Sequence, residues 1–361
     1  MLSIVQRPPS LEIEMNISPQ GLRAIDDGPP PVSRHTARSA IEHRPHTPNR
    51  RPHILACVDD SPRADAVAYH ALTVASSLGL EVTFARVIEQ SGQSAVPADP
   101  IEWQLRWETQ RSQLHDLEHR FDNGVKTAGV VLVGDPCDEL IDWSEVNGAT
   151  LLALSTGTRS ETNGMGPTTM RVLQSGTTSL LLVPPQAQSS AHRYRRIMVP
   201  IDGSSRAESV LPIARRIARS HGAELLLVHT VPKAGASQGF QGKNVGTLHA
   251  EIERQNKQNA KSQLEQLTAR VEDDGITVQS VLLGPADPRH ATCQLSKDRE
   301  VDLVVMSSHG ATALSDIPCG SVAEYLATHC SMPVLMVRPN LVTDFGAGRF
   351  DTNGQSVFRF G

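Results

Sequence analysis

The chain repeats itself, and this repeat constrains its fold more than any other feature. At an offset of 143 residues, Ile54–Asp59 matches Ile197–Asp202, and small and apolar residues continue to match in the same order beyond these segments. Further along, Leu151–Ser155 corresponds to Leu303–Ser307, and Leu180–Val183 corresponds to Val334–Val337. Ordered matching of this kind predicts two copies of one domain, one following the other along the chain, rather than one large domain.

Composition marks where the two copies begin and end. We expect a first domain at residues 53–185 and a second domain at residues 195–339. Residues 1–52 hold nine of the 24 prolines together with many arginines and histidines, so we expect a disordered tail that buries too little apolar surface to fold. Residues 340–361 are rich in glycine and polar residues and should form a flexible C-terminal tail.

Charge and cysteine content exclude several classes of protein. The formal net charge of −5 argues against a protein that coats nucleic acid. The five cysteines are scattered, as is typical of reduced thiols in the cytosol, and no apolar run reaches the length of a membrane span. The N-terminus has no apolar signal-peptide core. We therefore expect a cytoplasmic protein with neither a membrane nor a nucleic acid as its partner.

Each copy alternates apolar strands with amphipathic helices. In the second copy, Ile197–Asp202 has the composition of a strand, and Ser205 and Glu208 have the spacing of a capping box at the start of a helix. The other expected strands are 225–231, 276–283, 301–306 and 333–337, and the other expected helices are about 252–271, one capped by Asp287, and 322–328. This alternation predicts an α/β fold with a parallel sheet covered on both faces. Pro200 should end its strand, because it has no N–H for the ladder.

Two segments of the second copy should meet at the carboxyl ends of the strands, where open parallel sheets bind their ligands. Asp202 ends the first strand, and Ser307 begins the loop that runs through Gly310 to Gly320 and Ser321. Gly310 lets the backbone approach a phosphate without a Cβ in the way. Gly320 and Ser321 should open a helix, whose free N–H groups and positive dipole end suit an anion.

These segments resemble the universal stress protein family. The resemblance is carried by Val199–Ser204, Met306–Gly310, Gly320–Val322 and Pro333–Arg338. The family's ATP-binding pattern is a glycine, two residues, a glycine, nine residues, and a glycine followed by Ser or Thr. Here Ser307 stands in the first glycine place, while the later positions keep both residue type and spacing.

The resemblance implies two tandem five-stranded, parallel-sheet domains of Rossmann-like type, similar to the adenine-nucleotide alpha-hydrolases. It implies ATP as the ligand of the second domain, with Mg²⁺ accompanying the phosphates. The nucleotide-binding residues that it implies are Pro200, Ile201, Asp202, Val228, Ser307, His309, Gly310, Gly320, Ser321 and Val322. It also implies that the two domains associate along their last strands as an intramolecular pseudo-dimer, and a homodimer of whole chains is a further expectation.

The first copy departs from the ATP-binding pattern. Asp59 is retained, but Asp60 replaces the glycine of the second copy. Its loop is two residues shorter, so that Thr158 falls at Gly310 and Pro167 falls at Ser321. Proline has no N–H to offer a phosphate. We therefore expect the first copy to bind ATP weakly or not at all.

Three functions remain open from the sequence. The leading hypothesis is a stress-response protein that binds ATP and acts by regulation rather than by metabolic catalysis. The alternatives are a nucleotide-free scaffold that acts through protein partners, and a slow ATPase. No residue pattern predicts a catalytic residue or a metal site, since only His309 and Asp202 could serve as a base near a γ-phosphate.

Overall fold

The structure is a computed structural model of the chain. It describes residues 52–89, 100–121, 124–157, 165–176, 178–187, 193–232, 245–272, 275–310 and 319–345. The chain divides into two units, residues 1–37 and residues 38–361. The first unit lies outside the described residues, as does nearly all of the tail expected at residues 1–52, so the expectation for that tail stays a prediction.

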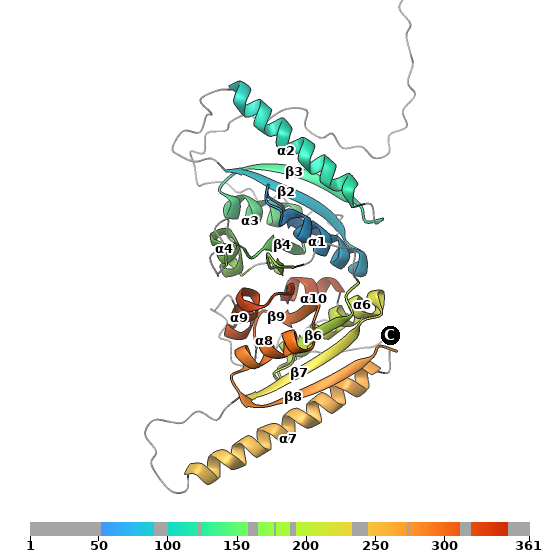
Figure 1. Cartoon of the computed structure of the whole chain (residues 1–361), viewed down its shortest axis with the longest axis vertical. Coiled ribbons are helices and arrows are strands. Elements are labelled where there is room, and N and C mark those ends of the chain that lie inside the picture. Colours follow the sequence, from blue (N-terminus) through green and yellow to red (C-terminus); the bar gives the residue numbers. More distant parts are fainter. Residues whose placement is uncertain are drawn as a thin grey trace, which may run out of the picture. The chain divides into compact units, whose positions relative to one another are not determined.

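Both copies follow the same order of strands and helices (Figure 1). The first copy consists of β1 (His53–Cys57), α1 (Ala64–Leu78), β2 (Glu81–Glu89), α2 (Pro100–Arg120), β3 (Thr127–Gly134), α3 (Pro136–Asn147), β4 (Leu151–Ser155), α4 (Pro167–Ser175) and β5 (Ser179–Val183). The second copy consists of β6 (Arg196–Pro200), α5 (Ser205–Glu208), α6 (Leu211–His221), β7 (Glu224–Pro232), α7 (Val245–Glu272), β8 (Val278–Ala286), α8 (Pro288–Asp298), β9 (Leu303–Ser307), α9 (Ser321–His329), β10 (Val334–Val337) and α10 (Pro339–Phe345).

The ten strands form one sheet in the order β3-β2-β1-β4-β5-β10-β9-β6-β7-β8. All strand pairs within a copy are parallel, and β5 and β10 are joined antiparallel, with Leu335 opposite Leu181. The strand order reverses between β1 and β4, and again between β6 and β9, which is where a doubly wound sheet binds ligands. The predicted α/β fold with two Rossmann-like domains in tandem is confirmed.

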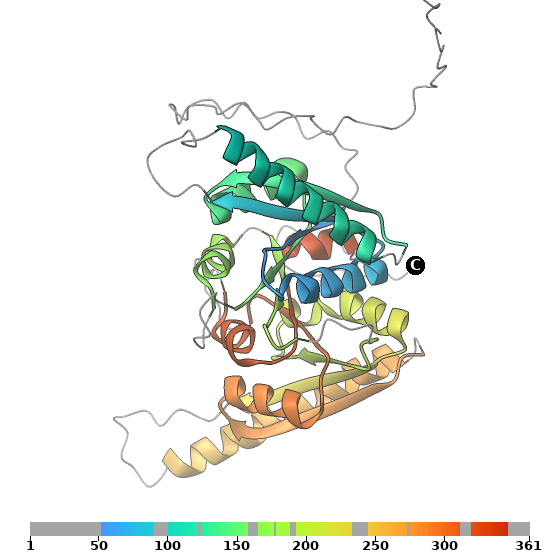
Figure 2. The same cartoon turned by 45° about the horizontal axis from the view of Figure 1, so that its top comes forward.

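Helices cover both faces of the sheet (Figure 2). One face packs its apolar side chains against α1, α2, α6 and α7, and the other face packs against α3, α4, α8 and α9. The strands at the centre are apolar on both sides, as their near-continuous apolar sequences predict. In β4 the side chains of Leu151, Leu152 and Ala153 are at most 2% exposed.

Local capping differs from the expectation at one helix and agrees at another. Ser204, not Ser205, caps α5, because its hydroxyl accepts from the N–H of Ala207 at 3.1 Å. Asp202 holds Ser204 in this extended conformation by accepting from both its N–H and its hydroxyl. At α8 the predicted cap is confirmed, since the Asp287 carboxylate accepts from the N–H of Arg289 at 2.9 Å. Pro200 is the last residue of β6, as expected.

The C-terminal tail starts later than expected. Residues 339–345 form α10, although we expected a flexible tail from residue 340. Leu341 is 0% exposed and belongs to the apolar cluster under α6, so a tertiary contact orders this segment. Residues after 345 lie outside the described residues.

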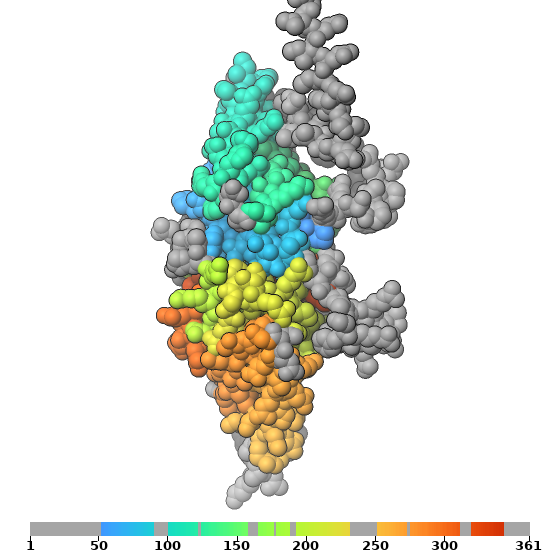
Figure 3. Space-filling view, turned by 90° about the vertical axis from the view of Figure 1, so that its right-hand side faces the viewer, coloured from blue at the N-terminus to red at the C-terminus, as the bar shows by residue number. Residues whose placement is uncertain are grey.

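A polar cluster joins α1 of the first copy to α6 of the second. The Ser77 hydroxyl donates to the carbonyl oxygen of Thr73 and therefore accepts from Nε2 of His221, at 3.0 Å. The ring of Tyr194 lies 5.0 Å from that of His221, and its hydroxyl lies 2.9 Å from Nδ1 of His70. On the face drawn in Figure 3, blue surface of the first copy adjoins yellow surface of the second.

This cluster should make the stability of the protein fall at acid pH. Burial, together with the charge of Arg193, lowers the pKa of His221 from its ordinary value of 6.5. Below about pH 6.5 the unfolded chain takes up a proton at this position that the folded chain resists, so the free energy of unfolding falls as the pH drops. The melting temperature should therefore decrease between about pH 7.5 and pH 5.5.

The His221→Gln variant tests the assignment, because its amide can still donate to Ser77 but does not titrate. Its melting temperature should fall less over the same pH interval than that of the wild type. Other histidines, among them His229, whose pKa burial also lowers, contribute equally to both proteins. Equal decreases in the two proteins would show that His221 contributes nothing to the acid sensitivity.

Candidate functional site

The structure brings the predicted site residues of the second copy together beyond the ends of β6 and β9. These strands are neighbours in the sheet, at the point where the strand order reverses. Asp202 lies two residues past the end of β6, and Gly310 lies three residues past the end of β9. A Cβ added to Gly310 would overlap Oδ2 of Asp202. The backbone at Gly310 therefore passes directly against the Asp202 carboxylate, and a larger residue there would displace that carboxylate.

The two ends of the loop after β9 are held next to each other. The N–H of Ser308 donates to the carbonyl oxygen of Val337 at 3.1 Å, and the N–H of Gly320 donates to the carbonyl oxygen of Ser308 at 2.7 Å. A Cβ on Gly320 would lie only 3.3 Å from that same oxygen. The start of α9 is therefore fixed beside the end of β9. Residues 311–318 of the loop lie outside the described residues.

The start of α9 has the properties of an anion site. Gly320 is its N-cap, has an extended backbone, and gives the helix no side-chain cap. Ser321 is exposed and Val322 is half-buried, so the first turn is open to solvent on one side. The N–H groups of a first helical turn have no partners within the helix and lie at the positive end of its dipole. An oxyanion placed there would meet donors rather than side chains.

The other predicted residues lie at the end of β6 and on β7. Ile201 donates its N–H to the carbonyl oxygen of Val228 at 2.7 Å, and both side chains are almost fully buried. A ligand at this edge would therefore meet the backbone of Ile201 and Val228 and the half-buried ring of Pro200. His309 is half-buried, and its Nδ1 lies 2.8 Å from the Ser308 hydroxyl.

One residue at this edge was missed by the sequence analysis. His229 follows Val228 on β7, and its pKa is lowered by burial and raised in part by the charge of Asp202. The register of the repeat could have found it, because Arg86 occupies the same place on β2 of the first copy.

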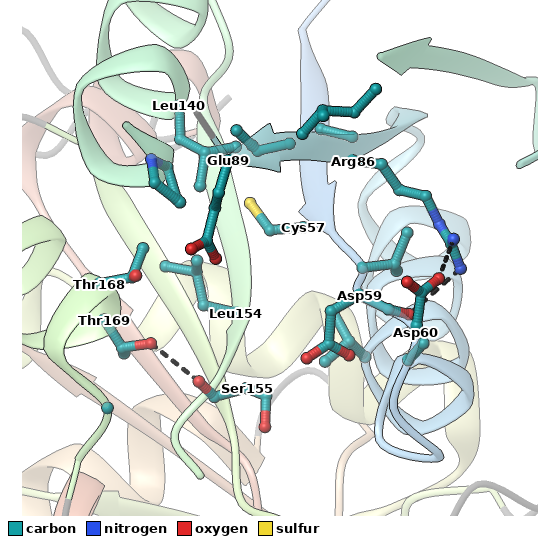
Figure 4. A pocket seen from close by; sticks show the side chains of 18 of the residues that line it. Cys57, Asp59, Asp60, Arg86, Glu89, Leu140, Leu154, Ser155, Thr168 and Thr169 are labelled. Carbon is teal, nitrogen blue, oxygen red and sulfur yellow. Dashed lines mark hydrogen bonds and ion pairs between the residues drawn. The ribbon is translucent and has the colours of Figure 1, made fainter. Parts of the chain in front are cut away.

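The first copy holds a large cavity at the corresponding place (Figure 4). Its volume is about 650 Å³, and it lies between the ends of β1, β2 and β4 and the start of α4. Val58, just past β1, supplies part of an apolar wall together with Ala85 of β2 and Leu154 of β4. The sequence analysis expected a degenerate loop here, and nothing in it indicated a cavity of this size.

Charged side chains distinguish this cavity from the site of the second copy. Arg86 is 8% exposed and donates to Asp60, to Gln110, to Gln113 and to the carbonyl oxygen of Asp59. The carboxylate of Glu89 also faces the cavity (Figure 4). The register places Gly203, His229 and Pro232 of the second copy at Asp60, Arg86 and Glu89. Two carboxylates thus occupy positions where the second copy has none.

The start of α4 offers a phosphate less than the start of α9 does. Pro167 is the first residue of α4, where the second copy has Ser321, and it has no N–H. The Thr169 hydroxyl is already engaged, because it donates to the carbonyl oxygen of Ser155 at 2.8 Å. Thr158, which the sequence places at Gly310, lies outside the described residues.

In the part of the chain that the structure describes, no three His, Cys, Asp or Glu side chains come close enough to bind a metal ion. Among the described helices, none combines the length and the apolar composition of a membrane span.

Comparisons with known proteins agree with this geometry. The sequence pattern of the universal stress protein family matches residues 51–184 and 193–338. A universal stress protein of Methanocaldococcus jannaschii is 28% identical over 155 residues, which cover 40% of this chain and 95% of that protein. A solved universal stress protein from Archaeoglobus fulgidus is 17% identical, with a TM-score of 0.54, and covers 79% of this chain and 97% of its own.

Another solved structure is of a universal stress protein in complex with cAMP. It is 19% identical, covers 41% of this chain and 98% of its own, and has a TM-score of 0.28. The family pattern matches well over half of the chain, in two segments that coincide with the two structural copies. The chain therefore belongs to the universal stress protein family, with two family domains in tandem.

Proposed function

We propose that the second domain binds ATP and that the protein acts in the stress response by regulation rather than by metabolic catalysis. The observation that carries this proposal is the meeting of the Asp202 carboxylate, the Gly310 backbone and the open first turn of α9 at one point of strand reversal. A site for a nucleoside polyphosphate needs hydrogen-bond acceptors for the nucleoside at one end and hydrogen-bond donors for the phosphates at the other. Asp202, after β6, would supply the acceptor, and the two ends of the loop after β9 would supply the donors.

Each part of ATP has a counterpart among these residues. The adenine and ribose would lie against Asp202 and the backbone of Pro200, Ile201 and Val228. The phosphates would accept from the N–H groups of Gly310, Ser321 and Val322, and Ser321 would add its hydroxyl. The N–H of Gly320 is held by the carbonyl oxygen of Ser308, so this residue would border the phosphates without donating to them. Mg²⁺, where it accompanies ATP, would bind the phosphate oxygens with water, which suits its octahedral coordination. Ser307 and His309 would border the loop, where the N–H of His309 lies 3.3 Å from the Ser307 hydroxyl.

The contacts and the position of the Asp202 carboxylate favour regulation over hydrolysis. Its Oδ1 already accepts from the N–H and the hydroxyl of Ser204, at 3.0 and 2.6 Å. A carboxylate that is engaged in this way, and that would face the adenine and ribose end of ATP, is not placed to activate a water that attacks a γ-phosphate. We propose that ATP is kept as a bound ligand, that the protein acts in the cytoplasm, and that the two domains form an intramolecular pseudo-dimer through β5 and β10.

The test is the identity of the small molecules that the protein retains through purification. Mass spectrometry of the released molecules should find ATP, and incubation with labelled ATP should give turnover far slower than that of a dedicated ATPase. A protein that carries no nucleotide and does not bind added ATP would be a scaffold instead. Rapid release of labelled phosphate would identify it as an ATPase.

We expect about one ATP per chain in isothermal titration calorimetry. The first domain should contribute little, because Pro167 removes an N–H from the start of α4 and because the Glu89 carboxylate faces its cavity. The cavity itself is large enough for a nucleotide, so the stoichiometry tests its chemistry rather than its size. A value near two sites of similar affinity would contradict this prediction.

A further inference from the structure

A buried arginine from the second domain enters the first domain. Arg338 follows β10, is 3% exposed, and donates to the carbonyl oxygens of Thr178 and Leu173, each at 2.8 Å. Its own N–H donates to the hydroxyl of Ser179 at 2.9 Å. Leu173 lies in the last turn of α4, where helix carbonyl oxygens lack partners within the helix and the dipole is negative. Arg338 therefore satisfies the exposed end of a helix in the other domain.

Asn340 completes the contact from the same segment. Its Oδ1 accepts from the Ser179 hydroxyl at 2.8 Å, and its Nδ2 donates to the carbonyl oxygen of Thr150 at 2.8 Å. Ser179 thus accepts from Arg338 and donates to Asn340, and both roles of its hydroxyl are used. We call Arg338 and Asn340 the plug, and we call Thr150, Leu173, Thr178 and Ser179 the socket.

The contact is one-sided although the strands that carry it are related by the repeat. In each copy, a backbone N–H just after the fourth strand donates to the carbonyl oxygen of the last residue of the fifth strand. In the first copy Thr156 donates to Val183, and in the second copy Ser308 donates to Val337. Pro184 of the first domain therefore stands where the second domain has Arg338. On the same register, Pro333 of the second domain stands where the first domain has Ser179. The first domain has no plug arginine, and the second domain has no socket hydroxyl.

We infer that Arg338 and Asn340 make the β10 edge of the second domain selective for a first domain as its partner. The inference rests on the β5–β10 pairing and is independent of ATP binding. Two second domains joined through β10 would bury two arginine side chains against sockets without the serine hydroxyl. Two first domains joined through β5 would leave the socket carbonyl oxygens without their donors. Each outcome buries polar groups that lack partners, which costs more than a mixed pair.

The test removes the tether between the domains and measures which halves pair. A protease site is placed in the linker between residues 187 and 193 of the full chain, the purified protein is cut, and the halves are left to exchange. Native mass spectrometry distinguishes the mixed pair from the two like pairs by mass. With the plug intact, nearly all pairs should be mixed. In the Arg338→Met, Asn340→Ala double variant, the mixed share should fall toward about half, the value for random pairing.

Two further variants make the result specific. Arg254→Met removes an exposed arginine of α7 and should pair as the wild type does. Ser179→Ala removes the central hydroxyl from the socket side and should shift pairing in the same direction as the double variant, which keeps the test decisive if that variant does not fold. A double variant that still gives only mixed pairs would overturn the inference. Random pairing, or complete separation, of the wild-type halves would overturn it as well.

Discussion

Replacing Gly310 with valine should abolish ATP binding by the second domain. A Cβ at this position would overlap Oδ2 of Asp202, so the branched valine side chain would push this carboxylate out of its place. Either this carboxylate or the loop backbone would shift, and the valine side chain would keep the phosphates away from the N–H groups of the loop. Such overpacking costs about 3 kcal/mol, which corresponds to roughly a hundredfold or greater loss of affinity. Isothermal titration calorimetry with ATP measures the effect.

A matched variant separates loss of the site from loss of the fold. Ala128 is exposed on β3 of the first domain, far along the sheet from Gly310, so Ala128→Val enlarges a side chain without touching the site. It should bind ATP with wild-type affinity. The Gly310→Val protein should also keep the far-ultraviolet circular dichroism of the wild type. If it is folded and binds ATP unchanged, the nucleotide site lies elsewhere in the chain.

The elements could be predicted from the sequence because local signals and the repeat agree. Apolar runs predict the central strands, and Asp287 followed by Pro288 predicts the start of α8, which the structure confirms. At α5 the spacing to Glu208 predicted Ser205 as the cap, whereas Ser204, one residue earlier, caps the helix. The Asp202 carboxylate decides between them by fixing Ser204 in an extended conformation. That contact depends on the chain turning back on itself and cannot be read from residue spacing alone.

The features that sequence reasoning missed depend on contacts between distant segments. Leu341 belongs to a polar, glycine-rich stretch and becomes buried only because α6 covers it. Arg338 is a charged residue that follows a strand, where a solvent-exposed side chain would be expected. It is buried because α4 and Thr178 of the other domain offer it carbonyl oxygens as acceptors. The cavity of the first domain likewise forms between three strands and a helix. In each case the partner lies far away in the sequence, where periodicity and propensity carry no information.

Replacing Leu335 with aspartate should unfold or separate the two domains. Leu335 lies opposite Leu181 on β5 and beside Val305 on β9, and its side chain is 0% exposed. A carboxylate there would have no water and no cation within the apolar core that spans both domains. Burying such a charge costs about 4 kcal/mol or more, even when the structure relaxes. The melting temperature measured by differential scanning calorimetry should fall by roughly 10 °C, or the transition should split in two.

The shape of the wild-type transition decides whether the two domains form one cooperative unit. An intramolecular pseudo-dimer predicts a single transition, because unfolding either domain exposes the paired edge of the other. Leu335→Met, which keeps the volume and the apolar character, should keep that single transition and lose less than about 1.5 kcal/mol. If the wild-type domains instead melt independently and the aspartate variant lowers only the transition of the second domain, β5 and β10 do not couple the domains. The pseudo-dimer would then be wrong, whatever the second domain binds.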